Sequence, residues 1–238
     1  MIQKYALVTG SAKRLGQDIA LKLTEQGYTV LFHYYTSTHE IAKLKKYFLK
    51  INKPFYAFKA DIKNKNQIKK MAKWINQNFG QLDLLINNVG NYKLADITEY
   101  TIEDWDDTIA SNLNGAFYCT HYLLDLLKQS KGNIINMGYA GADSIQANVN
   151  ATAYSISKTG LLILTKSLAK SLGHHKVRVN MVSPGHLENS IDLPTNYKEL
   201  IPLQRPGTSE DIFNAILFIL SNNYVPSINL EVTGGYQL

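Results

Sequence analysis

Short apolar runs alternate along the chain with longer segments in which apolar residues recur every three or four positions. The short runs are typical of buried strands, and the longer segments are typical of amphipathic helices. The predicted strands are residues 5–8, 29–34, 54–59, 82–86, 133–137, 177–182 and 229–232. The predicted helices are a segment that ends at Gly27 and residues 41–49, 68–79, 105–128, 153–172 and 208–220.

Strands that alternate with helices of this length predict a parallel sheet with right-handed crossovers and helices on both faces. The fold class is therefore α/β, a doubly wound sheet of the Rossmann type. The 238 residues suit one domain that covers residues 1–238. Residues 185–203 are rich in Pro, Asn and Ser, and we expect them to form a lid over the ligand site.

The composition, with 45% apolar and 18% charged residues, is that of a soluble globular protein. No apolar run is long enough to cross a bilayer, and the first residues lead directly into a strand without the features of a signal peptide. The single cysteine, Cys119, excludes an internal disulfide framework and a cysteine-based metal cluster. A cytoplasmic protein without a metal site is expected.

The net charge of +6 raises the possibility of nucleic-acid binding. The lysines of 43–46 and 63–73 lie in amphipathic helical segments without an aromatic-rich basic motif, so solvated lysines explain them better. We therefore expect neither nucleic acid nor membrane as a partner. A modest positive field would suit a phosphate-bearing cofactor or an acidic carrier protein.

The segment Thr9–Gly16, TGSAKRLG, connects the first strand to the first helix. Gly10 permits a tight turn, and Gly16 lets the helix approach the strand. The free N–H groups at the helix N-terminus can then bind a pyrophosphate, as in dinucleotide sites.

The end of the second strand indicates which dinucleotide is bound. NAD sites usually place an acidic residue there to bind the ribose 2′-hydroxyl, and residues 32–39 contain none. Lys13 and Arg14 supply cations, and Thr36 and Ser37 supply hydroxyls, all of which favour a 2′-phosphate. The expected cofactor is NADP(H). His33 is either a neutral histidine at the strand end or a contact to the 2′-phosphate.

Tyr154 and Lys158 stand four residues apart and so share one helix face. A free phenol has a pKa of about 10, and a nearby ammonium group lowers it. Such a phenol can protonate a carbonyl oxygen or an imine nitrogen while hydride reaches the carbon. A single Tyr-x-x-x-Lys match is more often a surface lysine beside a half-buried tyrosine, so its meaning depends on the upstream motifs.

Several motifs occur in a fixed order: TGSAKRLG, then NNVG at 87–90, SNLNG around Asn112, YSISK at 154–158, SPG at 183–185 and a GGY near the end. With them the chain resembles the short-chain dehydrogenase/reductase family over essentially its whole length. The resemblance implies an NAD(P)-dependent oxidoreductase with a seven-stranded doubly wound sheet and a small-molecule substrate. Members are usually homotetramers, and a homodimer is the other expected assembly.

The resemblance also implies roles for individual residues. Tyr154 corresponds to the acid/base, Lys158 to the residue that holds the nicotinamide ribose, and Asn112 to the asparagine that supports a proton-relay water. Asp61 corresponds to the residue at the adenine ring. The expected cofactor contacts are Gly10, Ser11, Lys13, Arg14, Leu15, Gly16, Tyr35, Thr36, Ser37, Asp61, Ile62, Asn87, Val89, Gly90, Pro184, Gly185 and Leu187.

One departure from the family pattern lies in the glycine loop, where Arg14 replaces the middle glycine. KRLG resembles the pteridine reductase branch, as does NNVGNY, in which Tyr92 is a candidate substrate wall. His186, in the predicted lid, is either a substrate contact or a solvent-facing histidine.

A second departure concerns the catalytic serine that the family carries after the fifth strand. Tyr139 occupies that position, and we expect its hydroxyl to orient the substrate. The stretch from Tyr139 to Tyr154 is slightly long for the family, so Ser144 or Asp143 could instead fold back into the site.

The sequence therefore predicts an NADPH-dependent reductase that transfers hydride to a carbonyl or imine carbon. A reduced pterin or folate is the substrate preferred by the motifs around Arg14. The alternative is a 3-oxoacyl-[acyl-carrier-protein] or small-ketone reductase, which the basic residues Lys166 and Lys170 on the catalytic helix would suit. A third hypothesis is a non-catalytic NADPH-binding sensor or scaffold, suggested by the absent serine.

Overall fold

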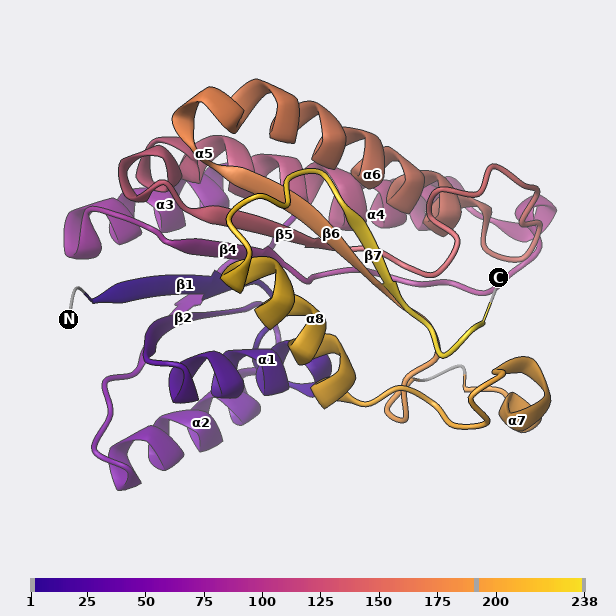
Figure 1. The fold of residues 1–238 in the computed structure, drawn as a ribbon, viewed down its shortest axis with the longest axis horizontal. Helices are drawn as coiled ribbons and strands as arrows, with labels where there is room; N and C mark the ends of the chain where they lie inside the picture. Colours follow the sequence, from indigo (N-terminus) through magenta and orange to yellow (C-terminus); the bar gives the residue numbers. More distant parts are fainter. Residues whose placement is uncertain (1–2, 191–192, 237–238) are drawn as a thin grey trace.

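A seven-stranded parallel sheet with helices on both faces forms the protein, whose computed structural model describes residues 3–190 and 193–236 (Figure 1). The strand order is β3-β2-β1-β4-β5-β6-β7, so the order reverses between β1 and β4. Ligands of such sheets bind outside the carboxyl ends of the strands at this reversal point. The strands are β1 (Lys4–Val8), β2 (Tyr28–Tyr34), β3 (Tyr56–Lys59), β4 (Leu84–Asn87), β5 (Asn133–Met137), β6 (Arg178–Pro184) and β7 (Asn229–Val232).

Helices α1, α2 and α8 cover one face of the sheet, and α3, α5 and α6 cover the other (Figure 1). This arrangement confirms the predicted fold class. The helices are α1 (Arg14–Glu25), α2 (Thr38–Lys50), α3 (Lys65–Phe79), η1 (Ile97–Glu99), α4 (Ile102–Ile109), η2 (Ala110–Asn114), α5 (Gly115–Ser130), α6 (Thr152–Leu172), η3 (Gly173–His175), α7 (Tyr197–Leu200) and α8 (Ser209–Ser221).

Each sheet face has its own apolar core. On the face of α1, α2 and α8, the rings of Phe32, Phe48 and Phe55 pack together with centroids 5.1–5.4 Å apart. On the other face, Met71 and Cys119 are fully buried among leucines and isoleucines. Burying one large apolar side chain contributes about 1.5–3 kcal/mol, so these two layers stabilise the packing of the helices on the sheet.

The long helix predicted for residues 105–128 consists of α4 and α5 joined by the π-helical turn η2. π-helical turns inside α-helices are frequent at functional sites, and η2 contains Asn112. The third strand begins at Tyr56, two residues later than predicted, and Pro54, which has no N–H to donate, lies outside the ladder. The short helices η1 and α7 were not predicted, since three or four residues carry no helical period.

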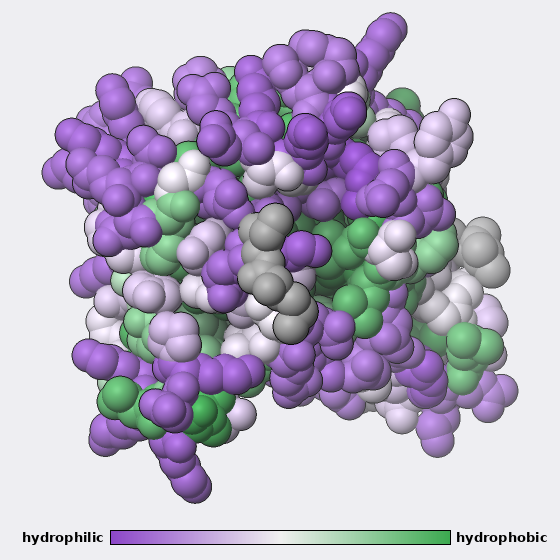
Figure 2. Space-filling model, turned by 60° about the vertical axis from the view of Figure 1, so that its left-hand side comes forward, coloured by the Kyte–Doolittle hydropathy of each residue, from purple (hydrophilic) through white to green (hydrophobic). Residues whose placement is uncertain are grey.

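Hydrophilic side chains cover most of the face shown in Figure 2, with apolar areas between them. The lysines of α2 and α3 are exposed, as expected for amphipathic helices; they are Lys43, Lys45, Lys46, Lys50, Lys65, Lys69, Lys70 and Lys73. In the described ranges, no helix is both long and apolar enough to span a membrane.

The predicted lid, 185–203, leaves the end of β6 and includes α7, while its residues 191–192 lie outside the described part. Leu187 forms an isolated parallel bridge with Gly207. Closure of this segment over a ligand stays a prediction.

Candidate active site

The glycine loop joins β1 to α1 at the reversal point of the sheet. Gly10 has a φ of +65°, which favours glycine. A Cβ atom on Gly16 would lie 2.5 Å from both the Asn88 Nδ2 and the Gly10 carbonyl oxygen. Only glycine therefore allows the start of α1 to pack this closely against the loops after β1 and β4.

Arg14 takes the left-handed conformation, with a φ of +53°. For a non-glycine residue this conformation costs roughly 1–2 kcal/mol. The loop therefore keeps the backbone shape that a glycine would adopt easily, and adds a cation. Arg14 and Lys13 are both exposed at the start of α1.

His33, near the end of β2, is hydrogen-bonded to the backbone of the glycine loop. It is 2% exposed, and its Nδ1 accepts a hydrogen bond from the Gly10 N–H at 3.0 Å. Burial lowers the pKa of His33 to about 4, and the backbone of Ala60 and the carboxylate of Asp61 offset this only in part. The imidazole is therefore neutral at pH 7, which its role as an acceptor requires. Of the two roles left open by the sequence, the structure supports the neutral histidine at the strand end.

Ser11 and Thr9 use their hydroxyls inside the protein. The Ser11 Oγ accepts from the His33 backbone N–H at 3.0 Å. The Thr9 Oγ1 accepts from the backbone N–H groups of Asn88 at 2.9 Å and Val89 at 3.1 Å, which ties the loop after β1 to the loop after β4. Ser11, expected as a cofactor contact, is fully buried, and its hydroxyl and its backbone N–H are both bonded to the backbone of His33, so the structure does not support this contact.

The start of α1 has the features that a dinucleotide phosphate requires. The residue that caps it, Lys13, makes no side-chain cap hydrogen bond, and the first turn contains no acidic residue. The N–H groups of this turn and the two cations can therefore meet an anion. Leu15 lies half-buried in the same turn. With the space at Gly10 and Gly16, this loop fits a dinucleotide.

The other residues expected around the adenosine half lie at the carboxyl ends of β2 and β3. Tyr35 and Thr36 are exposed, and Ser37 is half-buried just before α2. The half-buried Asp61 accepts from the Lys63 backbone N–H at 3.0 Å. Ile62 is buried against Gly115, so its side chain supports α5 and faces away from solvent.

Asn87 differs from the expected open contact because its side chain is buried. Its Nδ2 donates to the Asn136 Oδ1 at 2.8 Å, and the Asn136 Nδ2 donates to the Thr165 Oγ1 at 2.8 Å. A polar row thus crosses the ends of β4 and β5 and reaches α6. A cofactor could contact Asn87 only through its backbone.

Lys158 contacts Met137, the last residue of β5, through its side chain. Its side chain is 3% exposed, and its Nζ donates to the Met137 carbonyl oxygen at 2.7 Å. Burial lowers the pKa of Lys158 to about 8. The Nζ lies 5.7 Å from the centroid of the Tyr154 ring, and a Cβ atom on Gly90 would lie 3.4 Å from it. The structure therefore brings Tyr154 and Lys158 together on one face of α6, and it also places Gly90 beside Lys158, which the sequence did not predict.

Tyr154 stands between two other tyrosines. The Tyr92 ring meets it edge to face at 5.0 Å, and the Tyr139 ring does so at 5.3 Å. Tyr92 is 42% exposed, whereas Tyr139 is half-buried and packs partly on an apolar cluster beneath α6. The three phenols form an aromatic group, and Tyr139 lies where the family serine is expected.

Asp143 and Ser144, the alternatives for the missing serine, are exposed on the loop before α6. Within the described part of the chain neither side chain has a hydrogen bond to a residue of the site. The structure gives no support to a chemical role for either.

Asn112 joins three segments. Its Oδ1 accepts from the Asn91 N–H at 2.6 Å, and its Nδ2 donates to the Asn91 carbonyl at 2.9 Å and to the Ser157 Oγ at 3.0 Å. The side chain thus connects η2 to the loop after β4 and to the catalytic helix α6. A role in supporting a relay water stays a prediction.

The segment after β6 lies beside the C-terminal residues. A Cβ atom on Gly185 would lie 2.9 Å from the Thr233 Cα, so the backbones approach closely here. The half-buried His186 packs its ring edge to face against Tyr236, with centroids 4.6 Å apart. Pro184 and Leu187 are half-buried beside it. Contacts of these residues with nicotinamide or substrate stay predictions.

Sequence reasoning missed four residues that shape the site: Thr9, Asn88, Asn91 and Asp107. The second asparagine of NNVG was a usable signal, because Asn88 donates to the Thr9 carbonyl at 2.9 Å. Asp107 had no signal, since the sequence shows it only as one of several acids in α4. In the described residues, no group of three or more His, Cys, Asp and Glu side chains could hold a metal ion.

The site therefore combines a phosphate-binding loop with a phenol beside a buried lysine, at the carboxyl edge of a doubly wound sheet. These are the parts of a nicotinamide-dependent oxidoreductase.

Comparison with known proteins agrees with this class. A family model described as "Enoyl-(Acyl carrier protein) reductase" matches residues 10–237. The chain is 32% identical to the 3-oxoacyl-[acyl-carrier-protein] reductase FabG of Staphylococcus epidermidis, over 100% of both chains. A short-chain dehydrogenase from Bacillus anthracis superposes with a TM-score of 0.88 at 27% identity, covering 99% of this chain and 97% of that one.

A blue fluorescent protein from a metagenomic library, solved in complex with NADPH, superposes with a TM-score of 0.91 at 25% identity, covering 99% of this chain and 98% of that one. The chain belongs to the short-chain dehydrogenase/reductase family and is an NAD(P)-dependent oxidoreductase. The closer likeness to pteridine reductases, predicted from KRLG and NNVGNY, stays a prediction.

Proposed function

We propose that the protein is an NADPH-dependent reductase of 3-oxoacyl thioesters. The observation that carries the proposal is the Tyr154–Lys158 pair at the carboxyl edge of the sheet. The Lys158 Nζ lies 5.7 Å from the centroid of the Tyr154 ring, beside Gly90. The 3-oxoacyl-[acyl-carrier-protein] reductase at 32% identity over the full length favours a β-keto thioester as the substrate class. The sequence motifs favoured a pterin or folate substrate, with the 3-oxoacyl thioester as the alternative. We now prefer the thioester.

NADP(H) is the proposed cofactor because the site offers cations and hydroxyls where an NAD site would have a carboxylate. Lys13 and Arg14 are exposed at the start of α1, and Thr36 is exposed after β2. An NADPH complex of a structural relative supports the same choice. When bound, the cofactor supplies the hydride.

In the proposed reaction, Tyr154 donates its phenolic proton to the substrate carbonyl oxygen. The Lys158 ammonium, fixed by the Met137 carbonyl, stabilises the phenolate that remains. Tyr92 and Tyr139 flank the acid with their rings. Asn112 holds the loop of Gly90 and Asn91 against the catalytic helix.

Tyr139 is proposed to orient the substrate carbonyl in place of the family serine. Its ring centroid lies 5.3 Å from that of Tyr154, so Tyr139 stands next to the proposed acid. Tyr139→Phe should lower kcat about tenfold, which corresponds to one hydrogen bond, while the Kd for NADPH stays the same. An unchanged kcat would show that the Tyr139 hydroxyl does not orient the substrate.

A pterin or folate substrate is the second candidate. The observation that favours it is the exposed, left-handed Arg14 in the position of a glycine, which could reach an anionic or heteroaromatic substrate. The buried His33 weakens this candidate, because it removes one of the expected contacts at the second strand. The non-catalytic alternative is disfavoured, since the Lys158 Nζ lies 5.7 Å from the centroid of the Tyr154 ring and Asn112 is bonded to Ser157 on the same helix.

The assembly and cellular setting are proposed with the function. We expect a homotetramer or homodimer that works in the cytoplasm and receives its acyl substrate on an acidic carrier protein. The exposed Lys166 and Lys170 on α6 could contribute to docking of such a carrier.

The test is NADPH consumption by the purified protein with acetoacetyl-coenzyme A and a dihydropterin in parallel assays. Turnover of the thioester alone is the expected result. Turnover of the pterin alone would overturn the proposed substrate and make Arg14 a substrate-side residue. Binding of NADPH without turnover of any ketone would favour the non-catalytic alternative.

A further inference from the structure

Asp107 lies on α4 and bridges two loops that belong to distant strands. One carboxylate oxygen, Oδ1, pairs with the Lys63 Nζ at 2.5 Å, and the other, Oδ2, accepts from the Asn91 Nδ2 at 2.5 Å. Lys63 follows β3 and Asn91 follows β4, and two strands, β2 and β1, lie between these in the sheet. One carboxylate therefore connects the loops that follow two strands separated by two others in the sheet.

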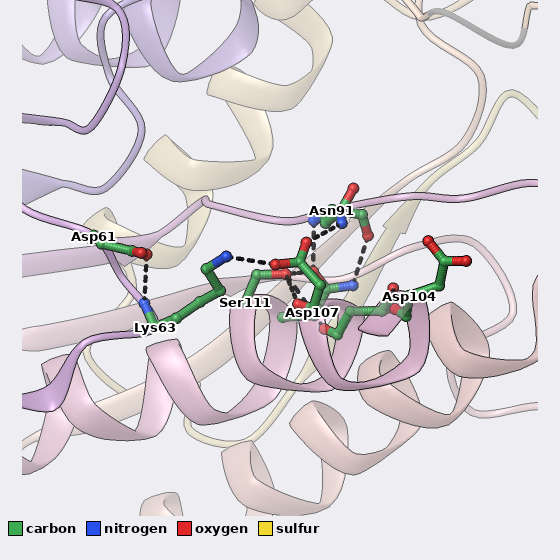
Figure 3. A network of polar contacts seen from close by, with 8 residues as sticks. Asp61, Lys63, Asn91, Asp104, Asp107 and Ser111 are labelled. Carbon is green, nitrogen blue, oxygen red and sulfur yellow. Dashed lines mark hydrogen bonds and ion pairs between the residues drawn. The ribbon is translucent and has the colours of Figure 1, made fainter. Parts of the chain in front are cut away.

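At one end the bridge reaches the segment expected to meet the adenine. The Lys63 backbone N–H donates to the Asp61 Oδ1 at 3.0 Å, so the two residues form one small turn (Figure 3). In Figure 3, Lys63 extends from this turn toward Asp107, while Asp104, one turn earlier on α4, points away from the group. Asp104 pairs instead with Lys93.

At the other end the bridge continues into the catalytic helix. Asn91 exchanges two backbone hydrogen bonds with the Asn112 side chain, and Asn112 donates to the Ser157 Oγ at 3.0 Å. The Ser157 hydroxyl donates to the Tyr154 carbonyl oxygen at 2.7 Å. An unbroken row of hydrogen bonds therefore runs from the turn at Asp61 to the backbone of the acid.

The central part of this row is the strongest. Asn112 and Ser157 are buried, where hydrogen bonds are little weakened by water. The Asn91–Asp107 bond is charge-assisted, which makes it about twice as strong as a neutral one. Lys63 and Asp107 have side chains 38% and 39% exposed, so their ion pair is screened and should contribute less.

We propose that Asp107 is a positioning residue that couples occupation of the adenine end of the cofactor site to the placement of Tyr154. The inference rests on the proposed function, because it takes Asp61 as the adenine side and Tyr154 as the acid. A ligand that orders the turn of Asp61 and Lys63 fixes the Asp107 carboxylate. The carboxylate then holds Asn91 and Gly90 against Asn112 and α6.

The variant Asp107→Asn keeps the size of the side chain and removes its charge. Asp106→Asn is the matched control, because Asp106 is an exposed neighbour on the same helix and undergoes the same charge change. Lys63→Gln removes the ion pair with Asp107 at the exposed end of the bridge. The protein should still fold, because the Lys63 side chain is exposed. Lys65→Gln is the control for that lysine.

The first readout is amide hydrogen exchange with 2′,5′-ADP, which carries only the adenine half of the cofactor. In the wild type, 2′,5′-ADP should slow exchange at residues 61–63 and also at 89–93 and 154–158. In Asp107→Asn the slowing should remain at 61–63 and disappear at the other two segments. Asp106→Asn should behave like the wild type.

The second readout is kcat at saturating NADPH. Asp107→Asn should lower kcat about tenfold, and Lys63→Gln about threefold, with the effect of Lys63→Gln absent once Asp107 is Asn. A lower melting temperature with unchanged kcat and unchanged exchange would overturn the coupling and leave Asp107 a structural residue. Slowed exchange confined to 61–63 in the wild type would also overturn it.

The failure of the proposed function looks different in the same experiment. If 2′,5′-ADP does not bind the wild type, the NADP(H) assignment fails, and the coupling fails with it. If 2′,5′-ADP slows exchange at all three segments but no ketone is reduced, the coupling holds and the proposed reaction fails.

Discussion

The two sides of the site are held by different forces. On the cofactor side, buried polar groups fix the glycine loop, with His33, Ser11 and Thr9 each engaged in directed hydrogen bonds. On the substrate side, Tyr92, Tyr139 and Tyr154 meet through ring contacts, and the loop before α6 is exposed. Directed bonds demand particular residues, whereas ring packing accepts substitutions. The cofactor side therefore follows its motif closely, whereas on the substrate side the motifs indicate the tyrosines but not how their rings pack together.

The largest expected effect tests the substrate side. Tyr154→Phe removes the only hydroxyl assigned to proton transfer and should lower kcat by about 10²–10⁴-fold. The Kd for NADPH should change less than twofold, because the ring contacts remain. Steady-state kinetics and fluorescence titration measure both values. Tyr100→Phe, whose hydroxyl bonds only the Lys93 carbonyl among the contacts described, is the control. Unchanged turnover in Tyr154→Phe would show that Tyr154 is not the proton donor.

The next effect tests the cofactor side through pH. The pKa of His33 is lowered from 6.5 to about 4 in the folded protein, so between these values the unfolded chain binds a proton that the folded protein does not. Stability from this group is complete above pH 6.5 and declines by about 3 kcal/mol as pH falls to 4. His33→Asn keeps an acceptor near the Gly10 N–H and does not titrate.

Urea unfolding at several pH values measures this difference. The wild type should lose stability more steeply than His33→Asn between pH 6.5 and 4, while the exposed His174→Asn should follow the wild type. Parallel curves for wild type and His33→Asn would contradict a buried, neutral His33.

A third effect concerns the lysine that links the two sides. Burial lowers the pKa of Lys158 to about 8, so the ammonium is lost as pH rises through that value. The kcat/KM for NADPH should fall tenfold per pH unit above about 8, because this parameter reports ionisations of the free enzyme. Lys166→Gln, on the exposed face of α6, should keep the same profile. If kcat/KM for NADPH stays constant between pH 7 and 9.5, ionisation of Lys158 does not control the reaction.

The smallest effect tests the strained loop. Arg14→Gly should raise the free energy of unfolding by up to about 1 kcal/mol, because glycine adopts the left-handed conformation without strain. The same change should weaken NADPH binding relative to NADH. Lys13→Gly is the control, since Lys13 is extended, with a φ of −156°. If the two glycine variants have equal stability, the conformation of Arg14 carries no strain.

The sequence by itself determined the layers of the fold and most of the cofactor side. Strand and helix periods predicted the doubly wound sheet, and TGSAKRLG indicated the tight turn at Gly10, whose φ is +65°; the close approach of Asn88 to Gly16 comes from the loop after β4. The spacing of Tyr154 and Lys158 predicted a shared helix face. Local backbone geometry depends on residues close together in the chain, so a short motif can predict it.

Only the tertiary structure decided what distant segments do together. The burial of His33, the pairing of Tyr139 with Tyr154 and the bridge at Asp107 each depend on packing between elements far apart in the chain. The division of the predicted helix by η2 has the same origin, since it brings Asn112 to Asn91 and Ser157. No periodic pattern records such contacts, because burial and long-range hydrogen bonds arise only when the layers close around the sheet.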